Sequence, residues 1–295
     1  MSRLALLALL RLTATLPLAW NHRLGALLGG LLWRIPNPLR RIAERNLALC
    51  FPEQSALERN RLLRRNLQET AKGLLELGPL WLWPGERALE LIQKPAAGED
   101  ALAAAVSRKQ GVILVTPHLG AWELAGLYYS SRYPLTILYR PSRMGLDEIS
   151  RRGRGRLGGQ VVATDAGGLR ALLTALHRGE ALGILPDQDT GGVGDGEGLF
   201  APFFGITAGT MTLVSRLALK NQIPVFLTWA ERLPCGQGYT LHLRALPAVT
   251  AAASLQASVA ALNQGVEAAA RALPEQYLWA YKRFKTRPPG EPKLY

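Results

Sequence analysis

The sequence predicts an α/β fold, in which a layered and largely parallel β-sheet carries flanking helices behind a helical N-terminal segment. Short apolar runs alternate with helical segments beyond about residue 88, which is typical of a parallel sheet with crossover helices. The first 85 or so residues have helical spacing only. With 295 residues, of which 48% are apolar and 19% charged, the chain can bury a sizeable core and is not a disordered polymer.

The N-terminal segment, residues 1–35, is rich in Leu, Ala and Gly but carries Arg11 and Arg23. A secretory signal peptide would have an uninterrupted apolar core, so this class of segment is excluded. A spanning helix would place Arg11 near its middle, at a cost of about 2.5–3.5 kcal/mol. We therefore expect a helical membrane-associating segment that lies in the interface, with a tilted single span or an ordinary buried helix as alternatives.

The charge of the chain favours an anionic partner. The formal net charge is +13, which suits nucleic acid, an anionic membrane surface or a phosphorylated substrate. Arg34, Arg40, Arg41 and Arg45 follow the apolar segment directly, and each such charge attracts anionic lipid by about 1 kcal/mol. A solvated helix face is the alternative explanation for this cluster.

Residues 36–85 are predicted to form a helical front part of the region 36–295. Asn37 and Pro38 are typical of an N-cap and first helical position. Ser55 and Glu58 have the spacing of a capping box that begins a second helix. This helix is predicted to end at Gly78-Pro79 or at Pro84-Gly85, and the front part to pack on an α/β body over residues 86–295.

The α/β body is predicted from five apolar runs and four helical segments. The runs expected to be strands are 112–116, 135–139, 161–163, 181–185 and 223–228. The helical segments between them are 101–109, 122–131, 169–177 and 211–220. Ligands of such open sheets bind at the carboxyl ends of the strands.

A candidate catalytic pair lies at one of these strand ends. The apolar run 112–116 stops at Pro117, His118 follows in the turn, and a helix begins near Trp122. If Glu123 lies in the first helical turn, its carboxylate can meet the His118 ring, fix the tautomer and stabilise the imidazolium. The other ring nitrogen is then free to take a proton from an alcohol. Taken alone, a histidine at a strand end is also compatible with a structural role.

Seven motifs occur together along the chain. In order they are His118-x4-Glu123, YRP at 139–141, RGR at 152–154, LPDQD at 185–189, FAPFFG at 200–205, QYLW at 276–279 and RFKTRP at 283–288. With this set, the chain resembles the lipid A late (secondary) acyltransferases, the lauroyl and myristoyl transferases within the glycerolipid acyltransferase superfamily. The resemblance covers nearly the whole chain, including the apolar N-terminus.

The resemblance implies a glycerolipid acyltransferase-like fold, with residues 36–295 as the acyltransferase domain and His118 and Glu123 as a dyad that activates a hydroxyl. The expected reaction moves a fatty acyl group from acyl carrier protein to a hydroxyl of a Kdo-modified lipid A precursor. It implies no metal or organic cofactor, and a location at the cytoplasmic face of the inner membrane. The basic surface suits an acidic carrier protein. A lysophospholipid is the alternative acceptor.

Four arginines are candidates for binding the acceptor's phosphates and sugar acids: Arg140, Arg143, Arg152 and Arg154. A solvated helix or an RNA-binding patch is the alternative explanation of the basic segment, but the aromatic residues that stack on single strands are not interleaved here. Nucleic acid is therefore not expected as a partner.

Two further groups of residues are predicted to line the site. Asp187, Gln188 and Asp189 follow an apolar run and are expected to contact substrate or shape the site, with a divalent metal site as the alternative. Phe200, Phe203 and Phe204 follow a glycine-rich loop and would line an acyl-chain channel or pack in the core.

Other enzyme classes lack their motifs. The chain contains neither the Gly-x-Ser-x-Gly sequence of a serine hydrolase nor the phosphate-binding loop of a nucleotide hydrolase. A non-catalytic membrane scaffold stays possible at this stage, and it would not require His118 or Glu123.

Overall fold

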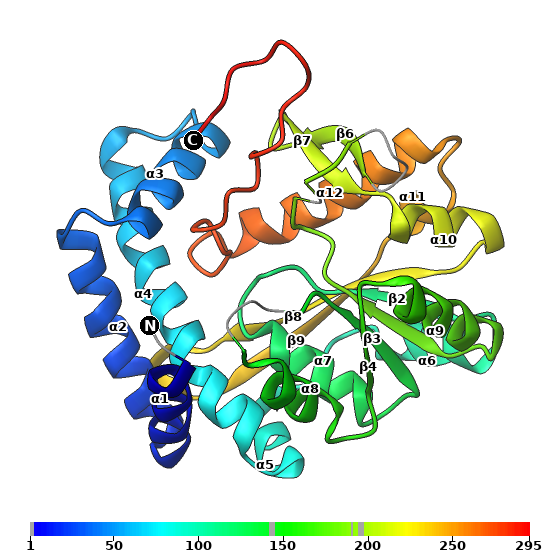
Figure 1. Cartoon of the computed structure of the whole chain (residues 1–295), viewed down its shortest axis with the longest axis horizontal. Coiled ribbons are helices and arrows are strands. Elements are labelled where there is room, and N and C mark those ends of the chain that lie inside the picture. The colour runs from blue at the N-terminus through cyan, green and yellow to red at the C-terminus, as the bar shows by residue number, and fades with distance from the viewer. Residues whose placement is uncertain (1–2, 142–144, 190, 194–197) are drawn as a thin grey trace.

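The computed structural model describes residues 3–141, 145–189, 191–193 and 198–295. Arg143, one of the predicted substrate-binding residues, lies outside these ranges. The helical front part and the α/β body lie side by side, with the blue and cyan helices of the front part along one side of the molecule (Figure 1).

Within the described residues, the N-terminal segment and the helical front part together contain five helices. They are α1 (Arg3–Thr15), α2 (Leu18–Arg34), α3 (Pro38–Cys50), α4 (Ala56–Leu82) and α5 (Gly85–Leu89). Local capping chemistry begins two of them as predicted: the Asn37 side chain accepts from the Arg40 amide, and Ser55 forms a complete capping box with Glu58. Helix α4 continues through Pro79 and ends at Leu82, so the predicted end at Pro84-Gly85 is closer to the observed one than the predicted end at Gly78-Pro79.

The α/β body contains the predicted strands and several that the sequence did not reveal. Its strands are β1 (Ile92–Lys94), β2 (Val112–Val115), β3 (Leu135–Tyr139), β4 (Gln160–Ala163), β5 (Ala181–Ile184), β6 (Gly198–Phe203), β7 (Ile206–Met211), β8 (Val225–Arg232) and β9 (Tyr239–Ala245). Its helices are α6 (Glu99–Ser107), α7 (Trp122–Ser130), α8 (Asp147–Gly155), α9 (Ala166–His177), α10 (Leu213–Asn221), α11 (Pro247–Thr250) and α12 (Leu255–Ala272), with a short 3₁₀ turn at Pro234–Gly236.

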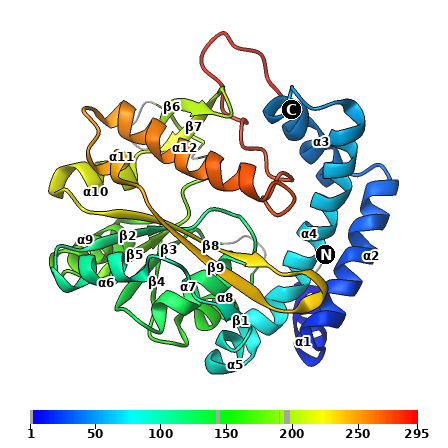
Figure 2. The same cartoon turned by 180° about the vertical axis from the view of Figure 1, so that it is seen from behind.

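The main sheet has the strand order β1-β9-β8-β2-β5-β3-β4 within the described residues. Strands β8, β2, β5, β3 and β4 run parallel, whereas β9 pairs antiparallel with β8. The prediction of a mixed α/β chain with a largely parallel sheet is confirmed. Strands β6 and β7 form a separate hairpin that packs beside α12 (Figure 2).

Alternate residues along the central strands face two separate cores. On β2, Ile113 and Val115 join the core beneath α9, α10 and α12, whereas Val112 and Leu114 join the core beneath α6 and α7. This two-residue period is the one expected of a strand buried on both faces. Both faces of the sheet are covered, and the carboxyl ends of β2 and β5 lie next to each other.

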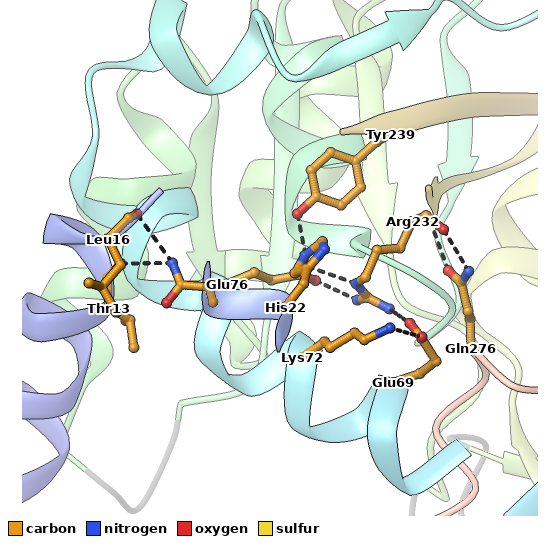
Figure 3. A network of polar contacts seen from close by, with 10 residues as sticks. Thr13, Leu16, His22, Glu69, Lys72, Glu76, Arg232, Tyr239 and Gln276 are labelled. Atoms are coloured by element: carbon orange, nitrogen blue, oxygen red, sulfur yellow. Dashed lines mark hydrogen bonds and ion pairs between the residues drawn. The ribbon is translucent and has the colours of Figure 1, made fainter. Parts of the chain in front are cut away.

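A buried polar network joins the N-terminal helices to the sheet (Figure 3). Glu76 of α4 accepts two hydrogen bonds from the Arg232 guanidinium of β8 and one from the Tyr239 hydroxyl of β9, and His22 of α2 lies 3.3 Å away. Burial would raise the pKa of the Glu76 carboxyl, but the charge and hydrogen bonds of Arg232 outweigh it and lower the pKa to about 2. The network therefore holds α2 and α4 to the adjoining ends of β8 and β9 as long as Glu76 is ionised.

Large apolar side chains are exposed on α1 and α2, together with Arg11 and Arg23. Leu4, Leu12, Trp20, Leu27 and Leu31 are each more than half exposed. The opposite side of α2 packs tightly on α4, where an added Cβ at Gly29 would lie 2.3 Å from the Gln68 Cα. Among the described residues, no helix combines the length and apolar character needed to cross a membrane.

Candidate active site

The register of two neighbouring strands brings His118 and Asp187 together. In the parallel pair β2–β5, Val115 lies opposite Ile184. His118 and Asp187 each follow three residues later, beyond the carboxyl end of their strand. Because parallel strands end at the same edge, the two side chains meet there.

Asp187 binds His118 through both carboxylate oxygens. One oxygen lies 2.8 Å from Nδ1 of the His118 ring, and the other accepts from the His118 backbone amide at 2.9 Å. The Gln188 Nε2 amide nitrogen lies 3.3 Å from His118 Nε2. In this arrangement Nδ1 carries the proton that is donated to Asp187, and Nε2 presents its lone pair.

Asp187 is held ionised although it is almost fully buried. Burial would raise the pKa of its carboxyl, but the electrostatic attraction of His118 and the two hydrogen bonds that His118 donates lower it below the ordinary value. The nearby Arg283 guanidinium acts in the same direction. The carboxylate is therefore available at neutral pH to orient the ring and to stabilise an imidazolium.

Glu123 has a different partner from the one predicted. Its two carboxylate oxygens accept from Nε and one terminal nitrogen of Arg154, at 2.8 and 2.5 Å. Burial would raise the pKa of Glu123, but the bidentate Arg154 outweighs it and lowers that pKa. The predicted contact between Glu123 and the His118 ring is not formed. His118 pairs with Asp187 and Glu123 pairs with Arg154, because Glu123 faces α8 from the first turn of α7.

The two pairs are nevertheless neighbours. Trp122 precedes Glu123, and its ring lies beside the His118 ring with 5.0 Å between centroids. Trp122, Glu123 and Arg154 also line one apolar cavity between α7 and the sheet. The structure thus places both predicted residues at the same strand edge, while a catalytic role for each stays a prediction.

The predicted arginines fall in different environments. Arg140 is exposed just beyond the end of β3. Arg152 is also exposed and pairs with Glu148 at 2.7 Å. Arg154, in contrast, is committed to Glu123, so it is part of the framework of the site in this structure.

Asp189 is turned away from His118 and holds the C-terminal segment. Its carboxylate accepts from the amide and hydroxyl of Thr286 and from the amide of Gly191. Asp187 and Asp189 therefore serve separate contacts. In the described ranges, no group of three or more His, Cys, Asp or Glu side chains is arranged to hold a metal ion.

Two of the three phenylalanines pack against other aromatic side chains. Phe203 and Phe204 are buried in an aromatic cluster. Their ring centroids lie 4.9 Å apart, and the ring centroids of Phe204 and Trp279 lie 5.4 Å apart. Phe200 is partly buried on β6. These contacts match core packing, the second of the two predicted readings, and the channel role stays a prediction.

A segment from the end of the chain supports the His118 turn, which the sequence reasoning did not foresee. The Leu278 amide donates to the His118 carbonyl at 2.9 Å, and the Gly120 amide donates to the Gln276 carbonyl at 3.1 Å. Gly120 has a φ of +60°, and an added Cβ would lie 2.0 Å from the Ala230 carbonyl oxygen, so only glycine fits. The QYLW motif at 276–279 was the available signal, although its position in the fold could not be read from it.

Comparison with known proteins places the chain in a family. The family model described as bacterial lipid A biosynthesis acyltransferase matches residues 2–286. The chain is 31% identical to the lipid A biosynthesis lauroyltransferase of Escherichia coli K12 over 98% of its own length and 93% of the relative's. It is 35% identical to the palmitoleoyltransferase of the same organism, covering 86% of this chain and 81% of the relative, and 25% identical to the myristoyltransferase, covering 92% and 82%. The chain is therefore an acyltransferase that belongs to the bacterial lipid A biosynthesis acyltransferase family.

Proposed function

We propose that this protein transfers a lauroyl- or myristoyl-type acyl group from an acyl carrier protein thioester to a hydroxyl of a Kdo-modified lipid A precursor. The observation that carries the chemistry is the His118–Asp187 pair, in which Nδ1 is hydrogen-bonded and Nε2 presents its lone pair at the strand edge. Membership in the lipid A acyltransferase family supports the choice of acceptor.

In the proposed reaction, His118 Nε2 accepts the proton of the acceptor hydroxyl while the hydroxyl oxygen attacks the thioester carbonyl carbon. The C–S bond then breaks, and the thiolate takes the proton from the imidazolium. The products are the acyl ester and the free thiol of the carrier. For the hydroxyl to reach Nε2, the Gln188 amide that now lies 3.3 Å away has to move aside.

Asp187 and Glu123 have separate parts in this proposal. Asp187 keeps the proton on Nδ1 and stabilises the imidazolium that forms during attack. Glu123 binds Arg154 and so fixes the first turn of α7, including the Trp122 ring beside His118. Arg140, just beyond the end of β3, and Arg152 of α8 are exposed and are proposed to bind the anionic groups of the acceptor.

We also propose that the protein works at the cytoplasmic face of the inner membrane through residues 1–35. The support is the exposed apolar surface of α1 and α2, where Leu27 is 71% exposed, and the arginines that follow it in α3. Such a surface gains free energy by entering the boundary between headgroups and acyl chains, while the arginines bind anionic lipid. The net charge of +13 also suits an acidic carrier protein.

The test is acyl transfer by the purified protein in detergent micelles that contain the Kdo-modified precursor and lauroyl or myristoyl carrier protein. Mass spectrometry should detect a product heavier by one acyl group, and His118→Ala should lower its rate of formation by about 10²–10⁴-fold. A lysophospholipid in place of the precursor should give little product. Efficient transfer to the lysophospholipid alone would overturn the proposed acceptor, and full activity of His118→Ala would overturn the mechanism.

A further inference from the structure

Near the end of the chain, residues 275–281 form an irregular segment that lies between the helical front part and the His118 turn. The chain leaves α12, passes α4 and ends beside α3 (Figure 1). Segment 275–281, all of it within the described residues, belongs to no helix or strand, and its residues are buried or partly buried. Its backbone groups therefore need hydrogen-bond partners that no helix or sheet ladder supplies.

Two buried asparagines of the helical front part bind one side of this segment. The accepting groups are the backbone carbonyls of its four odd-numbered residues. Asn66 of α4 donates through Nδ2 to the first two carbonyls, at 3.0 and 2.7 Å. Asn46 of α3 donates through Nδ2 to the last two, at 2.7 and 2.8 Å. Each asparagine is at most 1% exposed, so water does not compete for these hydrogen bonds.

The even-numbered residues of the segment bind the His118 turn and the sheet. The Leu278 amide donates to the His118 carbonyl at 2.9 Å, and the Gln276 carbonyl accepts from the Gly120 amide at 3.1 Å. The Gln276 side chain exchanges two hydrogen bonds of 2.9 Å with the backbone of Arg232 on β8 (Figure 3). The segment thus connects the two asparagines to the backbone that carries His118.

The surroundings of Asn66 indicate that this position requires two N–H donors. Among the described residues, the Asn66 Oδ1 oxygen is buried and has no hydrogen-bond partner, which destabilises the fold. An apolar side chain of similar size would avoid that penalty but could not bind the two carbonyls. Asn46 also uses its oxygen, which accepts from the Tyr295 hydroxyl at the end of the chain. Both amides therefore fix the backbone of segment 275–281 to the helical front part.

We propose that Asn46 and Asn66 are positioning residues for acyl transfer, which hold segment 275–281 against the turn and so fix the direction of the His118 ring. His118 is bound at both backbone groups, since its amide donates to Asp187 and its carbonyl accepts from the segment. Without the asparagine hydrogen bonds, the second of these contacts loosens. A displacement of about 1 Å at a reacting group can cost about 10²-fold in rate. The inference rests on the proposed function, because it assumes that His118 takes the hydroxyl proton.

The test replaces Asn46 and Asn66 singly by alanine and measures steady-state acyl transfer to the Kdo-modified precursor in detergent micelles. We expect each change to lower kcat about 10- to 100-fold and to leave the KM of both substrates within about threefold, because neither asparagine contacts substrate in the proposed reaction. Hydrogen–deuterium exchange of segment 275–281 should become faster in both variants, since its contacts open more often.

Ser258→Ala is the matched control for the loss of a buried hydrogen bond. Ser258 is fully buried and donates to the Val249 carbonyl at 2.7 Å. It lies 14 residues before the end of α12, which is about 21 Å along the helix axis from the point where the chain leaves that helix. Ser258→Ala should lower the melting temperature and leave kcat unchanged.

The His118→Ala background separates a positioning role from general damage to the fold. If the asparagines act through His118, Asn66→Ala should cause no more than about a twofold further loss in that background. A loss as large as in the parent protein would overturn the inference. Asn46→Ser and Asn66→Ser are measured alongside and replace any alanine variant that does not fold, since a serine hydroxyl is too short to bind both carbonyls.

Near-normal kcat in the variants of both asparagines, with an active parent protein and an inactive His118→Ala, would overturn the inference and leave the proposed function standing. Full activity of His118→Ala would overturn the proposed mechanism and the inference together. A loss of kcat in the asparagine variants that is absent from Ser258→Ala and vanishes in the His118→Ala background would support the inference.

Discussion

Asp187→Asn tests whether Asp187 is the carboxylate that acts through His118. In the structure one oxygen of Asp187 binds Nδ1 at 2.8 Å and the other binds the His118 amide at 2.9 Å. Asparagine keeps only one oxygen. If that oxygen stays on the backbone amide, the side-chain NH₂ faces Nδ1, and the ring proton moves to Nε2. The ring can then no longer accept the hydroxyl proton.

The expected loss is about 10²–10⁴-fold in kcat, which corresponds to about 3–5 kcal/mol in the activation free energy. The KM for either substrate should change little, because the lost interaction belongs to the transition state. The assay is steady-state transfer to the lipid acceptor, followed by mass spectrometry, with thermal unfolding measured on the same preparations. Asp165→Asn is the matched control, since Asp165 is an exposed N-cap that follows β4, and β4 is the third strand from β2 in the sheet.

A double-mutant cycle makes the test specific to the pair. Asp187→Asn should cause little further loss in the background of His118→Ala, because the two residues act as a unit. Glu123→Gln should still cause a loss in that background, since Glu123 acts through Arg154. The reasoning is refuted if Asp187→Asn retains near-normal kcat, or if Glu123 and not Asp187 is coupled to His118.

Other perturbations test the framework, the acceptor contacts and the membrane surface. The pKa of Glu76 is about 2 in the folded state and 4.5 ordinarily, so its ionisation stabilises the folded protein by about 3 kcal/mol above about pH 5, and this contribution is lost as the pH falls toward 2. Glu76→Gln should abolish this part of the pH dependence of the free energy of unfolding in urea. An unchanged pH dependence would contradict the assignment. Arg152→Ala should raise the KM for the lipid acceptor roughly 10-fold or more with little effect on stability. Arg154→Ala should instead lower kcat and the melting temperature, because it leaves Glu123 buried without its partner. Equal effects of the two variants on kinetics and unfolding would argue against an acceptor-binding role for Arg152 and a framework role for Arg154. Replacing Leu27 and Leu31 together by serine should weaken binding to anionic phospholipid vesicles at least about 10-fold at high salt, and binding that depends on salt alone would refute insertion of α2.

The sequence by itself determined the features that depend on neighbouring residues. The strands β2, β3 and β5 are apolar runs buried on both faces, and their positions could be read directly. The N-cap at Asn37 and the capping box at Ser55 are local hydrogen bonds between residues three apart. Strand β9 was not predicted, although it is the next strand after β8 in the chain and pairs with β8 along its whole length.

Only the tertiary structure decided which residues pair within the site. His118 and Glu123 are five positions apart, so the sequence suggested them as partners, yet the partner of His118 is Asp187, which is 69 positions away. Strand order and register create that contact, and neither can be read from composition or spacing. In the same way α8 supplies Arg154 to Glu123 across 31 positions. A sequence pattern indicates which chemical groups reach the edge of the sheet, whereas the order of the strands determines which of these groups touch, because that contact depends on segments far apart in the chain.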